Sequence, residues 1–397
     1  MIKPPIPENE MNRLLSLSEF DLDYSNLDDN FKDLTKLAAK VAGTNISLVN
    51  LIDSFTQWTI SSHGLEIDQM TREESVCQYT IVEESEFEVK DLSADERFKD
   101  RFYVKGEPNI RYYFGVPLRA NDGSNIGALC VLDSDVKSIN PEKIELLKII
   151  SDEIVNRLTA LKIIEGLKYR LSEANQNQKK VAHDIRGPIG GIIGLAQIIS
   201  EQGDENKLDE VLEFINLIQK SGNSLLELAD EILSTDQAQK INSDQFNLAV
   251  LKDKLEKLYT PQAVNKNIKF SIQTNSKADK IPFSKNKLLQ IIGNLVSNAM
   301  KFTPQDGSIF VELDIIKNEL NHTLKIIVKD SGVGLSEEGI NAILNGTAVS
   351  TNGTSGENGY GFGLALVKHL IDGLKGSLNI YSKAGEGATF EISLPQR

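Results

Sequence analysis

The stretch KNKLLQIIGNLVSNAMKF, residues 285–302, has the periodicity of an amphipathic helix and defines the fold class of the C-terminal part of the chain. A helix turns by about 100° per residue, which gathers the polar side chains on one stripe: Gln290, Asn294, Asn298 and Lys301. The apolar side chains take the opposite side: Leu288, Ile292, Leu295 and Ala299. Polar stripes usually face solvent, but two asparagines lower helix propensity, and oxygen ligands beside an ammonium suit a metal-bound phosphate. The stretch therefore predicts a helix with a candidate phosphate site on its polar side.

A strand and two glycine-rich segments follow this helix. Residues 326–330 form a predicted strand that ends in the carboxylate of Asp330, and Gly332 and Gly334 come directly after it. Missing side chains would let the backbone approach a flat ligand there. Further on, GYGFGL at residues 359–364 opens a predicted helix whose unpaired N–H groups would attract phosphate. Taken alone, the segment at Asp330 is more readily explained as an ordinary turn at a strand end, and neither a dinucleotide-binding fingerprint nor a P-loop occurs.

Alternating strands and helices surround these segments from about residue 245 onward. We expect a helix from residue 362, and strands near 308–316, 323–330, 377–382 and 388–394. The pattern predicts an α/β layer domain of about 150 residues.

In this order and spacing the elements resemble the Bergerat-type ATP-binding domain, an α/β sandwich shared by histidine kinases, Hsp90 chaperones, gyrases and MutL repair proteins. The resemblance implies ATP and Mg²⁺ as cofactors. Asn298, with Asn294 beside it, would coordinate the metal on the triphosphate, so that Asn298 is the implied metal ligand. Lys301 would meet phosphate, and Asp330 would accept the adenine amino group.

The same resemblance implies roles for the glycines and the C-terminal tail. Gly332 and Gly334 would line the base, while Gly361 and Gly363 would close the lid end and cradle phosphate. The tail contains GEGATF at residues 385–390, which matches the family's closing strand pair, and its Thr389 is counted among the nucleotide-binding residues.

The segment VAHDIRGP, residues 181–188, lies on a predicted long helix. Histidines on helices are usually inert, and only four occur in the chain, but His183 is followed within five residues by Asp184, Arg186 and Pro188. Pro188 removes the hydrogen bond to the carbonyl of Asp184 and should loosen the helix there. The segment resembles the phosphoacceptor box of sensor histidine kinases. The resemblance implies that His183 attacks the γ-phosphate and that Asp184 orients and deprotonates the ring, while Arg186 could pair with phosphate or with a carboxylate.

Apolar residues repeat every three or four positions on both sides of this segment. A helix should begin after Pro141, and its narrow apolar stripe between Ile150 and Ala174 suits a parallel two-helix seam. A turn at residues 203–206 precedes a second long helix, and two such helices form an antiparallel hairpin. Because one hairpin cannot bury both apolar faces, we expect a homodimer with a four-helix bundle.

The N-terminal part has a helical pattern from Phe31 to Val41 and four predicted strands: 46–52, 57–61, 112–118 and 126–132. We expect a mixed sheet with helices. The segments REESVC (72–77), FGVPL (114–118) and IGALCVLD (126–133) resemble those of a GAF sensory domain, an α/β sandwich. The bilin-binding and cyclic-nucleotide signatures of GAF domains are missing, so we expect Cys77 to be a packed small hydrophobe.

Composition limits the classes of partner. Net charge is −14, which weakens a case for nucleic acid or anionic lipid. Two cysteines and a polar start indicate a reducing cytoplasm, and no apolar run approaches the ~20 residues that cross a bilayer. We therefore expect a cytoplasmic protein without a membrane span.

These observations predict a multidomain α+β protein with the following boundaries: a polar segment at 1–24, a GAF domain at 25–148, a coiled-coil signalling helix at 149–178, a dimerisation and phosphotransfer hairpin at 179–240, and a catalytic ATP-binding domain at 241–397. The predicted function is that of a sensor histidine kinase that passes phosphate from His183 to an aspartate of a separate response regulator, under control of an unidentified GAF ligand. The alternative is a catalytically silent GAF scaffold that binds a partner kinase. A chaperone-type or topoisomerase-type ATPase would have no use for the His183 hairpin.

Overall fold

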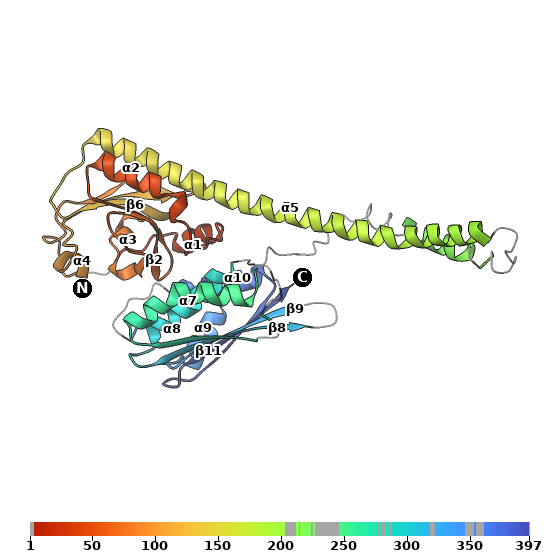
Figure 1. Cartoon of the computed structure of the whole chain (residues 1–397). Coiled ribbons are helices and arrows are strands. Elements are labelled where there is room, and N and C mark those ends of the chain that lie inside the picture. The colour runs from red at the N-terminus through yellow and green to blue at the C-terminus, as the bar shows by residue number, and fades with distance from the viewer. Residues whose placement is uncertain are drawn as a thin grey trace. The chain divides into compact units, whose positions relative to one another are not determined.

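The structure is a computed structural model that describes the following residues: 4–202, 212–213, 215–223, 225–226, 246–275, 278–279, 281, 283, 285, 287–317, 322–345, 353–354 and 361–396. Side chains are not described at 169–184 and 187. The chain divides into two compact units. The first contains residues 1–164, 246–281 and 285–396, and the second contains 165–245, 282–284 and Arg397. Figure 1 gives the element labels.

The N-terminal part begins with short helices and continues into a sheet. Its helical elements are α1 (Glu10–Ser18), η1 (Asp28–Asn30), α2 (Lys32–Ala42), η2 (Arg72–Glu74), α3 (Cys77–Thr80), α4 (Phe102–Lys105) and the start of α5 (Pro141–Gln202). Its strands are β1 (Ile46–Ile52), β2 (Thr56–His63), β3 (Gln69–Thr71), β4 (Phe87–Val89), β5 (Tyr112–Arg119) and β6 (Asn125–Asp133). The four predicted strands and the helix start at Pro141 are confirmed.

The six strands form one sheet in the order β3-β2-β1-β6-β5-β4. Every pairing in it is antiparallel, so the expectation of a mixed sheet is wrong. The reason is local: β1 and β2, and likewise β5 and β6, are joined by tight turns that reverse the chain, as antiparallel neighbours require. β1 lies in the middle of the sheet and all seven of its residues are buried.

The sheet has a separate hydrophobic core on each face. One core joins strand residues to α2 and α5, and its members include Phe31 just before α2, Leu34 of α2, and Ile150, Ile154 and Leu158 of α5. Figure 1 shows α2 and the start of α5 on the same side of the sheet. The other core joins Cys77 and Tyr79 of α3 to strand residues such as Tyr113 and Cys130. Burial on both faces explains why β1, β5 and β6 read as nearly continuous apolar runs.

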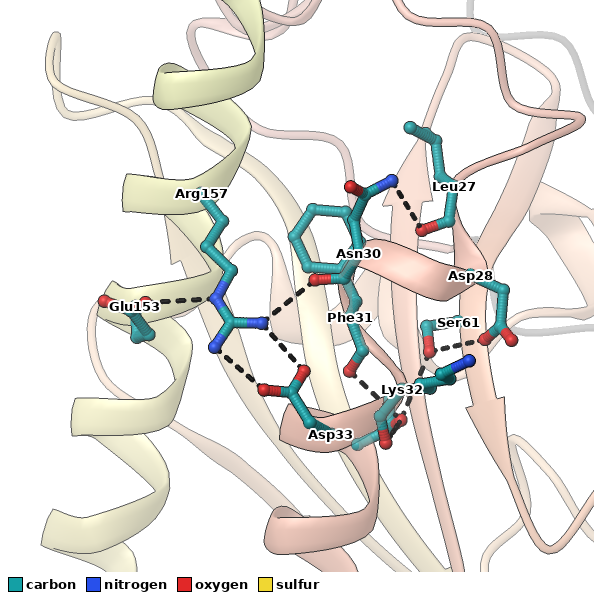
Figure 2. Close-up of polar contacts among 10 residues, drawn as sticks. Leu27, Asp28, Asn30, Phe31, Lys32, Asp33, Ser61, Glu153 and Arg157 are labelled. Atoms are coloured by element: carbon teal, nitrogen blue, oxygen red, sulfur yellow. Dashed lines mark hydrogen bonds and ion pairs between the residues drawn. The ribbon is translucent and has the colours of Figure 1, made fainter.

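Arg157 on α5 forms hydrogen bonds that hold this helix against α2 (Figure 2). Its guanidinium forms a bidentate ion pair with Asp33, with N···O distances of 2.7 and 2.9 Å. The same Arg157 donates to the carbonyl of Asn30 at 3.0 Å and, through Nε, to Glu153 at 3.1 Å. Planar bidentate pairs fix orientation as well as distance. The contact therefore sets the rotation of α5 against the sheet domain, although its partly exposed charges add little stability.

A cluster of buried charged side chains connects α1 to η2 and to the end of β1. Glu10 of α1 is 1% exposed and accepts two hydrogen bonds of 2.8 Å from Arg13. It also pairs with the buried Arg72 at 2.5 Å. Arg13 in turn donates to the carbonyl of Ile52 at 2.6 Å, which ties α1 to the end of β1. Burial raises the pKa of Glu10, but the hydrogen bonds and charges of Arg13 and Arg72 outweigh burial and lower it below 4.5.

Glu10→Gln should destabilise the N-terminal domain by about 3–5 kcal/mol at pH 7, because it leaves two buried guanidinium groups without their carboxylate. The chain's single tryptophan, Trp58, lies in β2 and reports unfolding of this domain by fluorescence in urea. Since the folded pKa of Glu10 is lowered, its contribution is complete above pH 4.5 and is lost as pH falls through the folded pKa. The difference in the free energy of unfolding between wild type and Glu10→Gln should therefore shrink as the pH falls. Glu8→Gln, at an exposed position, is the matched control and should change stability by less than about 0.5 kcal/mol; an equal effect of both variants would contradict the cluster's role.

The C-terminal part consists of helices α7 (Leu248–Asn265), α8 (Leu288–Phe302), α9 (Glu337–Leu344) and α10 (Gly363–Gly373), with strands β7 (Lys269–Thr274), β8 (Ser308–Lys317), β9 (His322–Asp330), β10 (Ser377–Ser382) and β11 (Ala388–Gln396). The predicted helices and strands of this part are confirmed, with α8 beginning at Leu288. The five strands form a sheet in the order β10-β11-β9-β8-β7, in which only β7 and β8 pair in parallel.

Helices α7, α8 and α10 cover one face of this sheet (Figure 1). On β9, Leu324, Ile326, Val328 and Asp330 are buried and alternate with more exposed residues. The period of two therefore points Asp330 to the helix-covered face. This places its carboxylate on the same side of the sheet as the polar stripe of α8.

The second compact unit contains the remainder of α5, which continues through Pro188 to Gln202. Described residues at 212–213, 215–223 and 225–226 are helical, whereas the expected turn at 203–206 lies outside the described residues. In the part of the chain that the structure describes, no helix is long and apolar enough to cross a membrane.

Candidate nucleotide-binding site

The polar stripe of α8 is buried. Asn294, Asn298 and Lys301 are 2%, 6% and 6% exposed, so a solvated face does not describe them. Asn294 donates through Nδ2 to the carbonyl of Gln290 at 2.9 Å, one turn back on the helix. The Nδ2 atom of Asn298 is buried and has no hydrogen-bond partner among the described residues. Because an unpaired buried amide is costly, this side chain is suited to a polar ligand.

The carboxylate of Asp330 is fixed by two backbone groups. Its Oδ1 accepts hydrogen bonds from the N–H of Gly332 at 2.8 Å and from the N–H of Ala388 at 3.3 Å. Both bonds reach the same oxygen, which leaves Oδ2 to accept from a ligand. Burial raises the pKa of Asp330, and the two N–H groups act in the opposite direction by stabilising the carboxylate.

Two glycines beside Asp330 allow the backbone segments to meet. Gly387 has φ +80° and a Cβ there would lie 2.1 Å from the carbonyl oxygen of Asp330. Gly334 has φ +67° and its Cβ would lie 2.1 Å from the carbonyl oxygen of Lys383. Neither contact leaves room for a side chain, and positive φ favours glycine as well. The loop after β9 therefore packs directly on the loop before β11.

The end of α8 is joined to the same loop. The N–H of Val333 donates to the carbonyl of Phe302 at 3.2 Å, which brings Gly332 next to the helix end. Lys266, which follows α7, donates through Nζ to the carbonyls of Met300 and Lys301 at 2.9 and 3.0 Å. A cation at the C-terminus of a helix interacts favourably with the negative end of the helix dipole. Lys266 was not predicted, because its partners lie 34 and 35 residues away and no local pattern connects them.

The N-terminus of α10 lies against the polar stripe. A Cβ at Gly363 would lie 3.1 Å from Oδ1 of Asn294. Gly361 lies two residues earlier, just before the helix. The structure thus brings Asn294 and the first turn of α10 together, where unpaired N–H groups favour an anion. Most of the loop between Asn345 and Tyr360, where a lid is expected, lies outside the described residues.

Thr389 is not brought to this site, which corrects the sequence interpretation. It pairs across the sheet with Lys329 and Tyr381, whose side chains are exposed. Its neighbours Ala388 and Phe390 are buried, so alternation turns the Thr389 side chain to the other face of the sheet from Asp330. The residue that reaches Asp330 is Ala388, through its backbone N–H. A backbone donor has no signature in residue type, which is why the sequence did not reveal it.

His183 and Asp184 lie within α5, as the sequence predicted for a long helix. Their side chains are outside the described part of the chain, so their roles stay predictions.

Comparisons with known families match two ranges of the chain. Residues 284–397 match the family model described as histidine kinase-, DNA gyrase B-, and HSP90-like ATPase. Residues 175–240 match the model described as His Kinase A (phospho-acceptor) domain, and this range includes His183. Neither range includes the N-terminal sheet. The chain therefore contains one segment similar to a phospho-acceptor domain and one segment similar to this ATPase family.

Curated relatives share parts of the chain. The autoinducer 2 sensor kinase/phosphatase LuxQ of Vibrio parahaemolyticus is 31% identical over 223 residues, which are 54% of this chain and 26% of that protein. The cyclic di-GMP phosphodiesterase PA2567 of Pseudomonas aeruginosa is 39% identical over 135 residues, which are 34% of this chain and 23% of that protein. The chain thus spans about a quarter of the length of these relatives.

Among solved structures, histidine kinase ThkA in complex with the response regulator protein TrrA aligns with 74% of this chain and 76% of its own, at 21% identity and a TM-score of 0.31.

Asp330→Asn and Asn298→Asp should each weaken ATP binding by at least about tenfold, equivalent to roughly 1.4 kcal/mol. The first change replaces an acceptor by a donor, and the second places a negative charge beside the triphosphate. Titration calorimetry with ATP and Mg²⁺ measures the effect. Asp372→Asn, at an exposed position on α10, is the control and should bind like wild type. Unchanged binding in both site variants would contradict a nucleotide site here.

Proposed function

We propose that this protein is an ATP-dependent sensor histidine kinase that phosphorylates itself on His183 and transfers the phosphoryl group to an aspartate of a separate response regulator. The observation that carries the proposal is the presence in one chain of a phospho-acceptor segment containing His183 and an ATPase segment. Within the ATPase segment, the buried stripe of α8 and the oriented carboxylate of Asp330 supply the polar groups that a nucleotide needs.

The residues of the ATPase segment fit an adenine nucleotide. Asp330 has one carboxylate oxygen held by backbone N–H groups, and the other would accept the adenine amino group. Gly332 and Gly334 would lie along the base, where added side chains would clash with backbone. Gly361, Gly363 and Lys301 would hold phosphate, and Lys301 would offset charge that develops during transfer.

A divalent cation fits the same stripe. Asn298 would hold Mg²⁺ on the triphosphate through its amide oxygen, with Asn294 beside it, and its buried Nδ2, which has no partner among the described residues, would donate to a phosphate oxygen. The metal would supply charge neutralisation of the phosphate oxygens. An amide oxygen and phosphate oxygens are ligands that Mg²⁺ accepts, and this ion usually keeps several waters.

The transfer itself would use the imidazole of His183 as nucleophile. A neutral ring nitrogen forms a bond to the γ-phosphorus while the bond from that phosphorus to the bridging oxygen of ADP breaks. The proton on the other ring nitrogen passes to Asp184, which leaves a phosphohistidine with a neutral imidazole ring. In the second step a carboxylate of the regulator attacks the same phosphorus, the P–N bond breaks, and the imidazole leaves as its other nitrogen takes back the proton from Asp184.

Dimerisation and sensory control are further parts of the proposal. On α5 the side chains of Ile163, Leu167 and Ile193 are 56%, 57% and 53% exposed. Apolar residues repeated along a helix favour pairing with a second copy, which supports a homodimer with a four-helix bundle. The N-terminal domain has the antiparallel sheet with helices and a cavity that a GAF-type sensor needs, and Arg157 joins it to α5. This supports control of the kinase by that domain.

His183→Gln should abolish phosphorylation of the protein and leave ATP binding unchanged, because the histidine is the acceptor and no part of the nucleotide pocket. The purified chain is incubated with radiolabelled ATP and Mg²⁺, and acid-labile label on the protein is measured. His369→Gln, at an exposed position on α10, is the matched control and should retain full label. Label retained by His183→Gln would refute the assignment.

The same experiment separates the proposal from its alternative. A catalytically silent scaffold that binds a partner kinase would show no label in the wild-type chain, even at ATP concentrations that calorimetry shows to be saturating.

A further inference from the structure

The two cysteines of the chain lie side by side in the N-terminal domain. Cys77 is the first residue of α3 and Cys130 lies in β6, and their Sγ atoms are 3.8 Å apart. They are 3% and 1% exposed, and the chain has no others. We expected Cys77 to be a packed small hydrophobe. Its burial agrees with that expectation, but its neighbours include a second thiol and polar donors.

Two hydrogen-bond donors are directed at the sulfur atoms. Nδ2 of Asn50 donates to Sγ of Cys77 at 3.2 Å and to Sγ of Cys130 at 3.3 Å. The hydroxyl of Tyr113 donates to Sγ of Cys77 at 3.3 Å. Asn50 is itself held by the hydroxyl of Thr59, which donates to its Oδ1 at 2.8 Å. These contacts stabilise a thiolate at Cys77, which a purely apolar environment would not.

The pKa values of the two thiols are shifted in opposite directions. Burial disfavours the thiolate of Cys77, but hydrogen bonds from Cys130, Tyr113 and Asn50 outweigh burial and lower the pKa of Cys77 to about 7. Burial raises the pKa of Cys130, and the neighbouring Cys77 raises it further. At neutral pH Cys77 is therefore the nucleophilic member and Cys130 remains a thiol.

A cavity of about 190 Å³ gives small molecules access to both sulfur atoms. Both cysteines line it together with Asn50 and Tyr113, and its other polar side chains include Glu66 and Glu107. A water molecule takes about 30 Å³ of liquid volume, so a molecule the size of hydrogen peroxide fits. The cysteines are thus buried in protein and still adjoin a space that an oxidant can enter.

We propose that Cys77 and Cys130 form a reversible redox site, which a small hydroperoxide entering this cavity oxidises to an intrachain disulfide. The thiolate of Cys77 attacks one peroxide oxygen, the O–O bond breaks, and hydroxide leaves, which gives a sulfenic acid at Cys77. The thiol of Cys130 then attacks that sulfur, forms the S–S bond and displaces the hydroxyl as water. Two thiols lose two electrons and two protons, and one peroxide is reduced to two waters.

The disulfide requires the sulfur atoms to approach from 3.8 Å to about 2.05 Å. Cys130 is held in the centre of the sheet, where it pairs with Leu48 of β1 and Gly115 of β5. Cys77 starts a helix of four residues that follows the extended Ser75. The required movement therefore falls on α3, which can shift without breaking the sheet.

The test uses the purified full-length chain and hydrogen peroxide. After reduction and desalting, thiols are titrated in denaturant and intact mass is measured. We expect both thiols to disappear together, with a mass loss of about 2 Da, monomer mobility on a non-reducing gel, and full recovery after dithiothreitol. Thiols that persist, single-step gain of oxygen without disulfide, or a disulfide between chains would each overturn the proposal.

Single variants test the assigned order of events. Cys130→Ser should stop at a sulfenic acid on Cys77 that dimedone traps. Cys77→Ser, which leaves only Cys130, should react with peroxide at least about tenfold more slowly, because its thiol stays protonated. Trp58 fluorescence in urea checks that both variants fold. Fast oxidation of Cys77→Ser with slow oxidation of Cys130→Ser would overturn the assignment. All of these readouts measure thiol chemistry, so their outcome is independent of the proposed kinase activity.

Discussion

The candidate site in the C-terminal part depends on the close contact between the end of β9 and the start of β11. Asp330 ends one strand, and the N–H groups of Gly332 and Ala388 hold one oxygen of its carboxylate. This arrangement requires Gly387 to approach the carbonyl of Asp330 without a side chain. The carboxylate then faces the covered side of the sheet with α8 above it. The polar stripe of α8 and the loop after β9 converge because Val333 bonds to the last turn of the helix.

The N-terminal domain has a different organising constraint, because its sheet is covered on both faces. α2 and α5 fill one face, and the other face is filled by short helices and loops around the two cysteines. The helix-covered face continues directly into α5, while the other face contains the cavity. Strands β1, β5 and β6 contribute side chains to both cores and so connect the cavity face to the face that α5 covers. Arg157 then fixes the angle at which α5 leaves the sheet.

Much of the fold could be predicted from hydrophobic periodicity. The strands 46–52 and 112–118 and the helix at 285–302 follow directly from alternation and from the period of 3.6. The same period placed Asn294, Asn298 and Lys301 on one stripe, whereas Asp330 was singled out as a carboxylate that ends a strand before two glycines, and the nucleotide-binding roles of all four came from the family resemblance. The sequence does contain the pattern that places Thr389 on the other face of the sheet. Every second residue is apolar and buried: Ala388, Phe390, Ile392 and Leu394. The side chain of Thr389, between the first two of these, therefore points to the opposite face. Two kinds of contact leave no local pattern in the sequence because they join distant segments. They are the hydrogen bonds donated by Lys266 and by the N–H of Ala388, and the contact between Cys77 and Cys130.

The packing around Asp330 also determines how the site can be damaged. Side chains usually matter for the groups they contribute, and mutational scans remove those groups one at a time. At Gly334 and Gly387 the essential feature is empty space, since a single added methyl group would meet a backbone oxygen at 2.1 Å. An alanine scan, which deletes atoms elsewhere in the chain, inserts them here. The same substitution that tests a contribution at most positions would act at these two as a wedge that separates the ends of the strands.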